Sequence, residues 1–193
     1  MFNDKYFLTQ AVLERKKTMT RRIVPYQIID NALAYKIKHI NTKETILHIV
    51  LDHASYQVGE TVAIAQSYNK IGISPSMYCE VSNEYGGTRD GTFEELAGWE
   101  NKMFVKAELM PHHIKITNIR VEYLQDISNE DCLKEGILRL HMCYVFQERL
   151  KKIYNYILDS PRDAFRILID KISGKGTWDN NPLVYVYEFE LID

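Results

Sequence analysis

The residues best suited to chemistry lie in one basic stretch near the start of the 193-residue chain. Residues 15–22 read Arg-Lys-Lys-Thr-Met-Thr-Arg-Arg, so two hydroxyl side chains, Thr18 and Thr20, lie among five cations. Such a cluster can bind an anion or a nucleic acid, or it can be a solvated helix end whose last carbonyls attract Lys and Arg. Judged by charge alone, the stretch is more often a solvated helix end than a binding site. The alternating Thr residues instead suit an extended segment, in which both would point the same way.

The composition is that of an ordinary globular protein with little overall charge. Hydrophobic residues make up 46% of the chain, charged residues 26%, and the net charge is -2. Because the chain has no overall positive field, we expect its ligand to be a nucleoside, a nucleotide or a short flipped base rather than a long nucleic acid. The three cysteines form no C-x-x-C pair, so we expect neither a zinc knuckle nor a redox pair, and no cofactor. The absence of a signal peptide and of a membrane-spanning apolar run predicts a cytoplasmic protein without a membrane partner.

The hydrophobic pattern predicts a mixture of helices and strands in one domain, residues 1–193. The predicted helices cover residues 6–15, 131–135 and 161–173. The predicted strands cover residues 35–40, 45–50, 61–66, 102–106, 114–121 and 183–191. In the strand at 114–121 the alternation slips near Asn118, which predicts a bulge. Residues 141–158 are apolar and aromatic, and their pattern fits either a helix or a strand.

Two of these helices have clear boundaries. An S-x-x-D capping box opens the helix at 131–135, and Gly136 ends it. Glu135 falls in the last turn, where the helix dipole disfavours an anion, so its carboxylate is either exposed or held by a cation. Exposure is the commoner case for a lone Glu. The later helix begins with Ser160 as its N-cap and Pro161 at its first position.

Two other stretches, residues 67–100 and the pair His112 and His113, also bear on function. Gly and Pro residues punctuate residues 67–100, which predicts an irregular insertion with a short helix at 92–97. Such an insertion is either functional or mobile. The adjacent His112 and His113 would face opposite sides of an extended chain, and no ligand spacing supports a metal site there.

The order of five short motifs resembles one known family. The motifs are K-T-M-T-R-R at 17–22, G-E at 59–60, V-E-Y-L-Q-D-I-S at 121–128, E-G-I at 135–137 and G-K-G-T-W-D-N-N-P at 174–182. Together they resemble the ASCH-domain proteins of the PUA-like superfamily, most closely the larger phage-associated and Bacteroidetes-type members. The resemblance implies an α+β fold, a small mixed β-barrel of PUA type with peripheral helices and a cleft beside the basic stretch.

The resemblance also implies roles for individual residues. Small bacterial ASCH proteins hydrolyse N4-acetylcytidine, and their catalytic Lys, Thr and Glu correspond to Lys17, Thr20 and Glu135. Thr20 would attack the acetyl carbonyl, Lys17 would accept its proton, and Glu135 would orient Lys17 or carry the proton to the leaving amine. The family's following Arg corresponds to Arg22, which would stabilise developing negative charge.

In a binding role, the ligand contacts would come from the same stretch and from one aromatic residue. Thr18, Arg21 and Arg22 would contact phosphate, and Trp178 would stack on a base. The chain departs from the family at residues 62–66, where V-A-I-A-Q replaces the W-x-R-E of larger relatives. The small hydrolases also lack the insertion and the Trp178 loop.

Three functions therefore remain open. The first is binding of RNA or a modified nucleoside or nucleotide beside residues 17–22. The second is an amidohydrolase that removes the acetyl group from N4-acetylcytidine-type substrates. The third is a phage or mobile-element accessory domain with a protein partner, in which the basic stretch holds the barrel together through buried bonds to carboxylates. Fold-level analogy does not choose between them.

Overall fold

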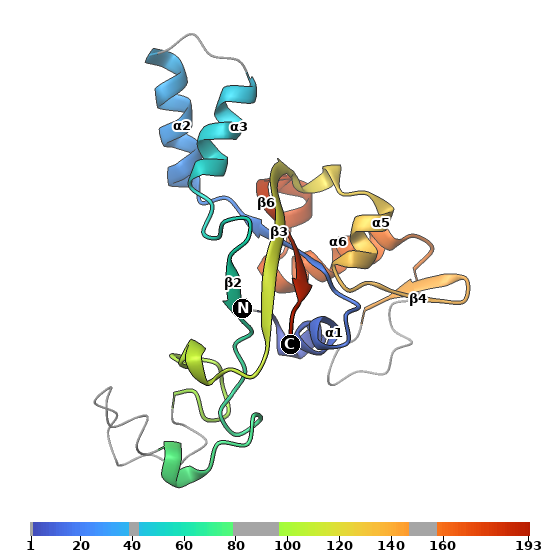
Figure 1. Cartoon of the computed structure of the whole chain (residues 1–193). Coiled ribbons are helices and arrows are strands. Elements are labelled where there is room, and N and C mark those ends of the chain that lie inside the picture. Colours follow the sequence, from blue (N-terminus) through green and yellow to red (C-terminus); the bar gives the residue numbers. More distant parts are fainter. Residues whose placement is uncertain (1, 39–42, 79–96, 147–157) are drawn as a thin grey trace. The chain divides into compact units, whose positions relative to one another are not determined.

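The computed structural model describes residues 2–38, 43–78, 97–146 and 158–193 (Figure 1). The chain divides into two units. The larger comprises Asn3–Thr61 and Lys115–Leu191, and the smaller comprises Met1–Phe2, Val62–Ile114 and Ile192–Asp193. The fold is of the mixed α+β class, as the sequence predicts.

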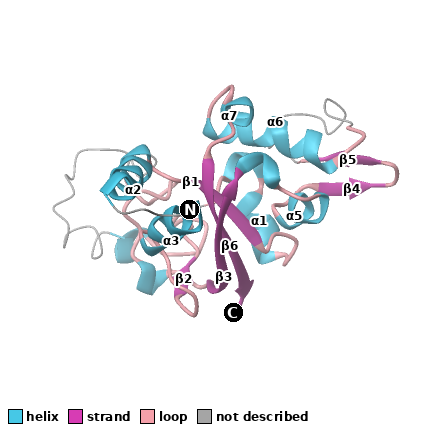
Figure 2. Ribbon diagram, turned by 90° about the horizontal axis from the view of Figure 1, so that it is seen from above, coloured by secondary structure: helices cyan, strands magenta, loops and turns pink. Residues whose placement is uncertain are grey.

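A curled antiparallel sheet of four strands organises the fold (Figure 2). Its order is β1-β6-β3-β2. The strands are β1 (Met19–Ile23), β2 (Thr61–Ala63), β3 (His113–Tyr123) and β6 (Leu183–Leu191). Strand β1 runs antiparallel to β6 with Thr20 opposite Tyr187 and Arg22 opposite Tyr185. The predicted strands at 114–121 and 183–191 are confirmed, and the predicted strand at 61–66 ends early, at Ala63.

The helices of the larger unit fall into two groups (Figure 2). One side of the sheet carries α1 (Leu8–Leu13), α5 (Asn129–Lys134), α6 (Pro161–Ser173) and α7 (Thr177–Asn180). Helices α2 (Tyr26–Lys38) and α3 (Lys43–Asp52) pack against each other as a separate pair. The short 3-10 helices are η1 (Asp4–Tyr6) and η4 (Leu124–Asp126), and β4 (Leu138–Leu140) and β5 (Cys143–Val145) form a hairpin. No helix in the described part of the chain is long and apolar enough to cross a membrane.

The predicted strands at 35–40 and 45–50 are wrong, because both stretches contribute to helices. Residues 35–38 form the end of α2, residues 39–40 lie outside the described part of the chain, and residues 45–50 lie within α3. The apparent alternation near residue 36 covers only the last turn of a longer segment. Ile28, Ile29 and Ala32 recur with the spacing of one helical face, and none of them is exposed. This helical spacing, which extends over the whole segment, makes it a helix and not a strand.

The helix ends follow the capping residues that the sequence shows. Ser128 accepts a hydrogen bond from the amide of Asp131 and opens α5, and Ser160 accepts one from the amide of Asp163 and opens α6. Gly136, with φ 104°, follows the end of α5 in a conformation that a side chain rarely adopts. The predicted helix at 6–15 is shorter, because η1 and α1 are separated by Phe7 in the left-handed region.

The smaller unit has its own aromatic core. Its buried members are Tyr68, Tyr78, Trp99 and Met110. The rings of Tyr68 and Tyr78 meet edge to face at 5.8 Å, and those of Tyr78 and Trp99 at 5.4 Å. The predicted strand at 102–106 does not form, and the 3-10 helix η3 (Ala107–Leu109) follows it. Most of the predicted helix at 92–97 lies outside the described residues.

Candidate functional site

Lys17 is placed by the turn that ends α1. Arg15 adopts a left-handed conformation with φ 57°, and the amides of Lys16 and Lys17 both donate to the carbonyl of Ala11. This turn directs Lys17 inward, where its side chain is 1% exposed. Its ammonium group donates three hydrogen bonds, to Met19 O at 2.7 Å, to Glu135 O at 2.8 Å and to Glu135 Oε2 at 2.6 Å.

Glu135 reaches Lys17 because α5 ends at this point. Glu135 is the C-cap residue of α5, so its own carbonyl is released from the helix ladder and accepts from Lys17. A Cβ on the next residue, Gly136, would lie 3.3 Å from Leu8 Cδ2 and 3.7 Å from Lys17 Cδ. The glycine therefore supplies both the left-handed backbone and the space beside the lysine stem. Of the two alternatives for Glu135, the structure shows that a cation holds its carboxylate.

Arg21 binds three carboxylates from the same buried side of β1. Its guanidinium donates to Glu122 Oε1 at 2.6 Å and 3.1 Å, to Asp131 Oδ2 at 3.1 Å and to Glu135 Oε1 at 3.1 Å. The phenyl ring of Phe165 on α6 lies 6.0 Å from Arg21 Cζ. Arg21 therefore joins β1 to β3, α5 and α6.

Arg120 extends this arrangement toward solvent. It donates to Glu122 Oε2 at 3.0 Å, to Asp131 Oδ2 at 2.6 Å and to Glu188 Oε1. Its side chain is 33% exposed, whereas those of Lys17 and Arg21 are 1% exposed. We call the whole group the ion network. Its members are Lys17, Arg21, Arg120, Glu122, Asp131, Lys134, Glu135 and Glu188.

The ion network is balanced in charge. Its cations are Lys17, Arg21, Arg120 and Lys134, the last 3.7 Å from Asp131 Oδ1, and its carboxylates are Glu122, Asp131, Glu135 and Glu188. Four positive and four negative groups leave no excess charge for a bound phosphate. The network is therefore suited to joining elements of the fold.

Burial and ion pairing act in opposite directions on the two buried cations. Burial lowers the pKa of Lys17, and the carboxylate of Glu135 opposes this change. Burial also lowers the pKa of Arg21, but Glu135 and Glu122 outweigh it and the pKa is raised. The three acceptors around Lys17 Nζ match the three N–H donors of an ammonium group. In this arrangement Lys17 is a donor, and it must first lose a proton, and with it one of these hydrogen bonds, before it can act as a base.

Thr20 and Arg22 lie on the opposite face of β1. Strand alternation directs their side chains away from the face of Met19 and Arg21. Thr20 is half-buried and Arg22 is exposed. Within the described part of the chain, no residue accepts or donates a hydrogen bond at the Thr20 hydroxyl. The structure thus brings Lys17 and Glu135 together and directs Thr20 elsewhere.

The remaining residues of the basic stretch and Trp178 have different surroundings. Thr18 precedes β1, and its carbonyl accepts from the amide of Phe189 at 2.9 Å. Trp178 on α7 is 9% exposed. Its ring lies edge to face with Phe165 at 6.3 Å, and Arg162 Cζ lies 5.3 Å from the ring centroid. The indole is therefore packed against α6.

Several members of the ion network were not singled out from the sequence. They are Arg120, Glu122, Asp131, Lys134 and Glu188. Two signals were present: Arg120 and Glu122 alternate with apolar residues on a strand, and Asp131 is part of a capping box. Neither signal shows that these groups meet Arg21, because the contacts join residues 101 and 110 positions apart.

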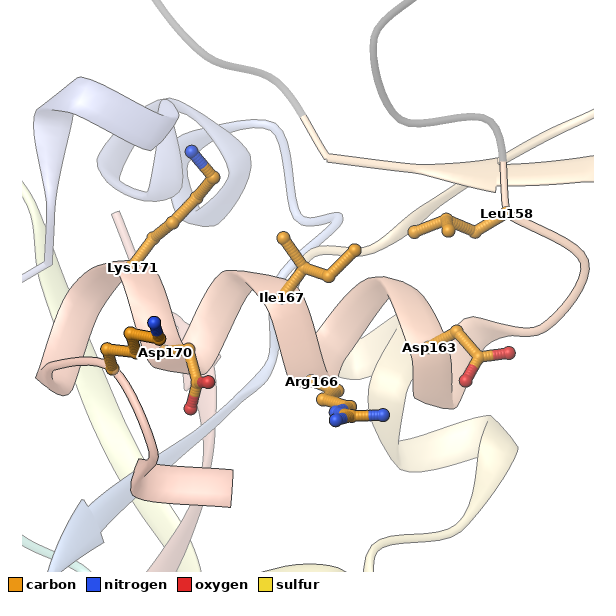
Figure 3. A pocket seen from close by; sticks show the side chains of 7 residues that line it. Leu158, Asp163, Arg166, Ile167, Asp170 and Lys171 are labelled. Carbon is orange, nitrogen blue, oxygen red and sulfur yellow. The ribbon is translucent and has the colours of Figure 1, made fainter. Parts of the chain in front are cut away.

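A hollow of about 590 Å³ lies along α6, beside Leu158 (Figure 3). Its described lining residues are Leu158, Asp163, Arg166, Ile167, Asp170, Lys171 and Lys175. None of the residues predicted to act in catalysis or binding is among them. In the described ranges, no group of three or more His, Cys, Asp and Glu residues is placed to hold a metal ion.

Comparisons with protein-family models, with curated proteins and with solved structures give no match for this chain.

Proposed function

We propose that this chain is a PUA-like domain of ASCH type that binds RNA, or a modified nucleoside or nucleotide, on the Thr20 and Arg22 face of β1. The observation that carries the proposal is the division of β1 into two chemically distinct faces. The Lys17 and Arg21 side is saturated by carboxylates, and the Thr20 and Arg22 side carries an exposed guanidinium beside a hydroxyl. A guanidinium and a hydroxyl two residues apart suit the oxygens of a phosphate.

An exposed aromatic residue follows this pair along the chain. Tyr26, the first residue of α2, is 74% exposed, and only four positions separate it from Arg22. A phenol ring with a free face supports stacking of a base. Trp178 has no such freedom because Phe165 and Arg162 pack against it. We therefore assign phosphate contact to Arg22 and Thr20 and base stacking to Tyr26.

The proposal is tested with a panel of ligands and two variants. Cytidine, N4-acetylcytidine, cytidine monophosphate and a short single-stranded RNA are each added to the wild-type chain, and the thermal midpoint is recorded. At least one phosphate-containing member should raise the midpoint, and Arg22→Gln and Thr20→Val should abolish the rise while keeping the fold. Lys175→Gln, which removes an exposed cation elsewhere, is the control and should behave as wild type. Absence of a rise with every member contradicts the proposal.

The contact between Lys17 and Glu135 supports a second candidate, the amidohydrolase. The resemblance assigns these two residues to catalysis, and their side chains meet at 2.6 Å. Burial lowers the pKa of Lys17, which is the direction that a general base requires. The position of Thr20 on the other face of β1 is unfavourable for a shared reaction centre.

Release of acetate from N4-acetylcytidine distinguishes the two candidates. Turnover by the wild-type chain that is lost in both Thr20→Val and Lys17→Arg supports the hydrolase. Saturable binding of the same nucleoside without acetate release supports the binding module. Thr20→Val is the sharper variant, because the Thr20 hydroxyl has no hydrogen-bond partner in the described chain whose loss would weaken the fold.

A further inference from the structure

The backbone of β1 has an inner and an outer set of polar groups. The ladder with β6 is fixed at both ends, by Phe189 N donating to Thr18 O and by Val24 N donating to Leu183 O, each at 2.9 Å. In an antiparallel pair, hydrogen-bonded residues alternate with residues whose N–H and C=O point away. With this register Thr20 and Arg22 bond to β6. The backbone groups of Met19, Arg21 and Ile23 point away from the sheet.

One end of this outer edge is closed and the other is open. The carbonyl of Met19 accepts from Lys17 Nζ at 2.7 Å. Over the ranges that the structure describes, the backbone N–H and C=O groups of Arg21 and Ile23 have no hydrogen-bond partner, and no strand adjoins this side of β1. Arg21 as a whole is 6% exposed while its side chain is 1% exposed, so its accessible surface belongs mainly to the backbone.

We propose that the open edge of β1, Arg21 to Ile23, binds an extended segment of an acidic partner protein, which pairs with β1 as an additional strand. The two outward residues offer two donors and two acceptors, which is the pattern that β-strand addition uses. The exposed Arg22 side chain lies between them and favours a carboxylate on the incoming segment. Ile23, which is 42% exposed, offers an apolar contact on the other face.

The charge of this edge favours an acidic partner over a second copy of the chain. Two β1 strands paired edge to edge would bring cationic side chains from both copies into one short ladder, and like charges across a ladder are destabilising. A segment that alternates Glu with Val meets Arg22 with the opposite charge and Ile23 with an apolar side chain. Such a segment and a nucleotide would compete for Arg22. The pairing of the segment with the β1 backbone is independent of nucleotide binding, because it does not involve the Thr20 side chain.

Hydrogen exchange of the full chain tests this proposal directly. The probe is acetyl-(Val-Glu)₃-amide, and acetyl-(Val-Lys)₃-amide is its control. In the free chain the amides of Arg21 and Ile23 should exchange rapidly, and those of Thr20 and Arg22 slowly. The acidic peptide at about millimolar concentration should slow amide exchange at Arg21 and Ile23 about tenfold, because it forms a weak complex with four backbone hydrogen bonds. The basic peptide should leave exchange at both amides unchanged. Protection of Arg21 and Ile23 in the free chain would overturn the proposal, as would equal effects of the two peptides.

Two variants at one position isolate the backbone contribution. Proline is tolerated on an edge strand where its missing N–H faces away from the sheet, so Ile23→Pro should fold and lose the peptide effect. Ile23→Val keeps the N–H and should retain the effect. Peptide protection at Arg21 that is unchanged in a folded Ile23→Pro chain contradicts the proposal. Sedimentation of the wild-type chain as a dimer that Ile23→Pro dissolves would assign the edge to a second copy instead.

Discussion

The ammonium nitrogen of Lys17 lies 2.6 Å from Oε2 of Glu135, although 118 positions separate the two residues. This contact joins the turn after α1 to the end of α5, and the neighbouring Arg21 joins both to β3 through Glu122. The basic stretch therefore contributes its buried cations to the fold. Its exposed side, with Arg22, is the part that we propose contacts a ligand.

Replacing Lys17 with Met should destabilise the chain by about 3–5 kcal/mol, because the change leaves a buried carboxylate without its partner. The loss should appear as a lower midpoint in urea unfolding followed by circular dichroism. The double variant Lys17→Met with Glu135→Leu should cost less than the sum of the two single changes, because no unpaired ion remains at this pair.

A neighbouring lysine supplies the control. Lys16 pairs with Glu14 at 2.5 Å, but both side chains are largely exposed, so Lys16→Met should leave the urea midpoint essentially unchanged. Equal losses from Lys16→Met and Lys17→Met would show that burial of the Lys17 pair contributes nothing to stability.

Arg120→Gln should cost about 1 kcal/mol or less, because Arg120 is one-third exposed and its ion pairs are partly screened by water. The loss of stability in Arg120→Gln should be smaller still in 1 M salt, because the electrostatic screening length falls to ~3 Å there. The cost of Lys17→Met should change little with salt. Thermal unfolding at two salt concentrations measures both, and a salt-independent Arg120 effect would contradict the proposed order of burial within the network.

How far the sequence predicts the fold depends on how local each signal is. The caps at Ser128 and Ser160 and the alternation of β6 involve neighbours along the chain, and all three predictions are confirmed. The secondary structure of residues 35–38 and 45–50 depends on longer helical segments, whereas a short window around them shows only a strand-like alternation. The helical period of 3.6 residues needs about two turns to become visible.

Strand β3 shows a second limit of pattern reading. Strand β3 runs from His113 to Tyr123, through the point near Asn118 where the slip in apolar alternation predicts a bulge. Asn118 and Arg120 both donate to Glu188 Oε1, so they lie on one face. Their polar side chains meet Glu188 of β6, whereas the residue between them, Ile119, is apolar. Because this partner is distant in sequence, a local pattern cannot reveal it.

The candidate site was predictable only in part, for the same reason. The resemblance named Lys17 and Glu135 together, and the structure brings them into contact. Strand alternation alone separates Thr20 from Arg21, once β1 is known to be extended. The carboxylates that neutralise Arg21 come from β3 and α5, and only the tertiary fold places them there.

Trp178→Leu should destabilise the chain by about 2–4 kcal/mol, because a buried ring that packs against Phe165 is lost. Binding of single-stranded RNA by the folded variant, measured at low temperature, should equal that of the wild-type chain. Tyr26→Leu should do the reverse, with little change in stability and weaker binding. An RNA-binding defect confined to Trp178→Leu would restore the stacking role to the tryptophan.

Cys132 should resist alkylation in the native chain. It is fully buried, and burial raises the pKa of its thiol to about 12, so almost no thiolate is present at pH 8. Cys143 is partly exposed and should react first. Mass spectrometry of peptides after brief iodoacetamide treatment measures the two rates, and comparable labelling at both sites would show that the region around α5 opens readily.

The contact between His113 and Asp193 within the smaller unit should weaken in acid. The hydrogen bond from His113 lowers the pKa of the Asp193 carboxyl below its ordinary 3.8. A depressed carboxyl pKa stabilises the folded contact above the ordinary value, and the stabilisation is lost as pH falls through the folded value. The amide of Ile192, which donates to His113 O, should therefore lose protection below about pH 3.8. In Asp193→Asn this acid-dependent loss should disappear, and its persistence would assign the change to another group.

The proposal that the Thr20 and Arg22 face of β1 binds a nucleic acid is tested most directly by the salt dependence of RNA binding. Affinity of the wild-type chain and of Arg22→Gln for a single-stranded RNA octamer is measured between low and moderate KCl. Loss of one phosphate contact should weaken binding by Arg22→Gln and lower the slope of log affinity against log salt by about 0.7. A slope and an affinity that are the same in both proteins, or no binding by the wild-type chain, would contradict the assignment of this face to a nucleic-acid ligand.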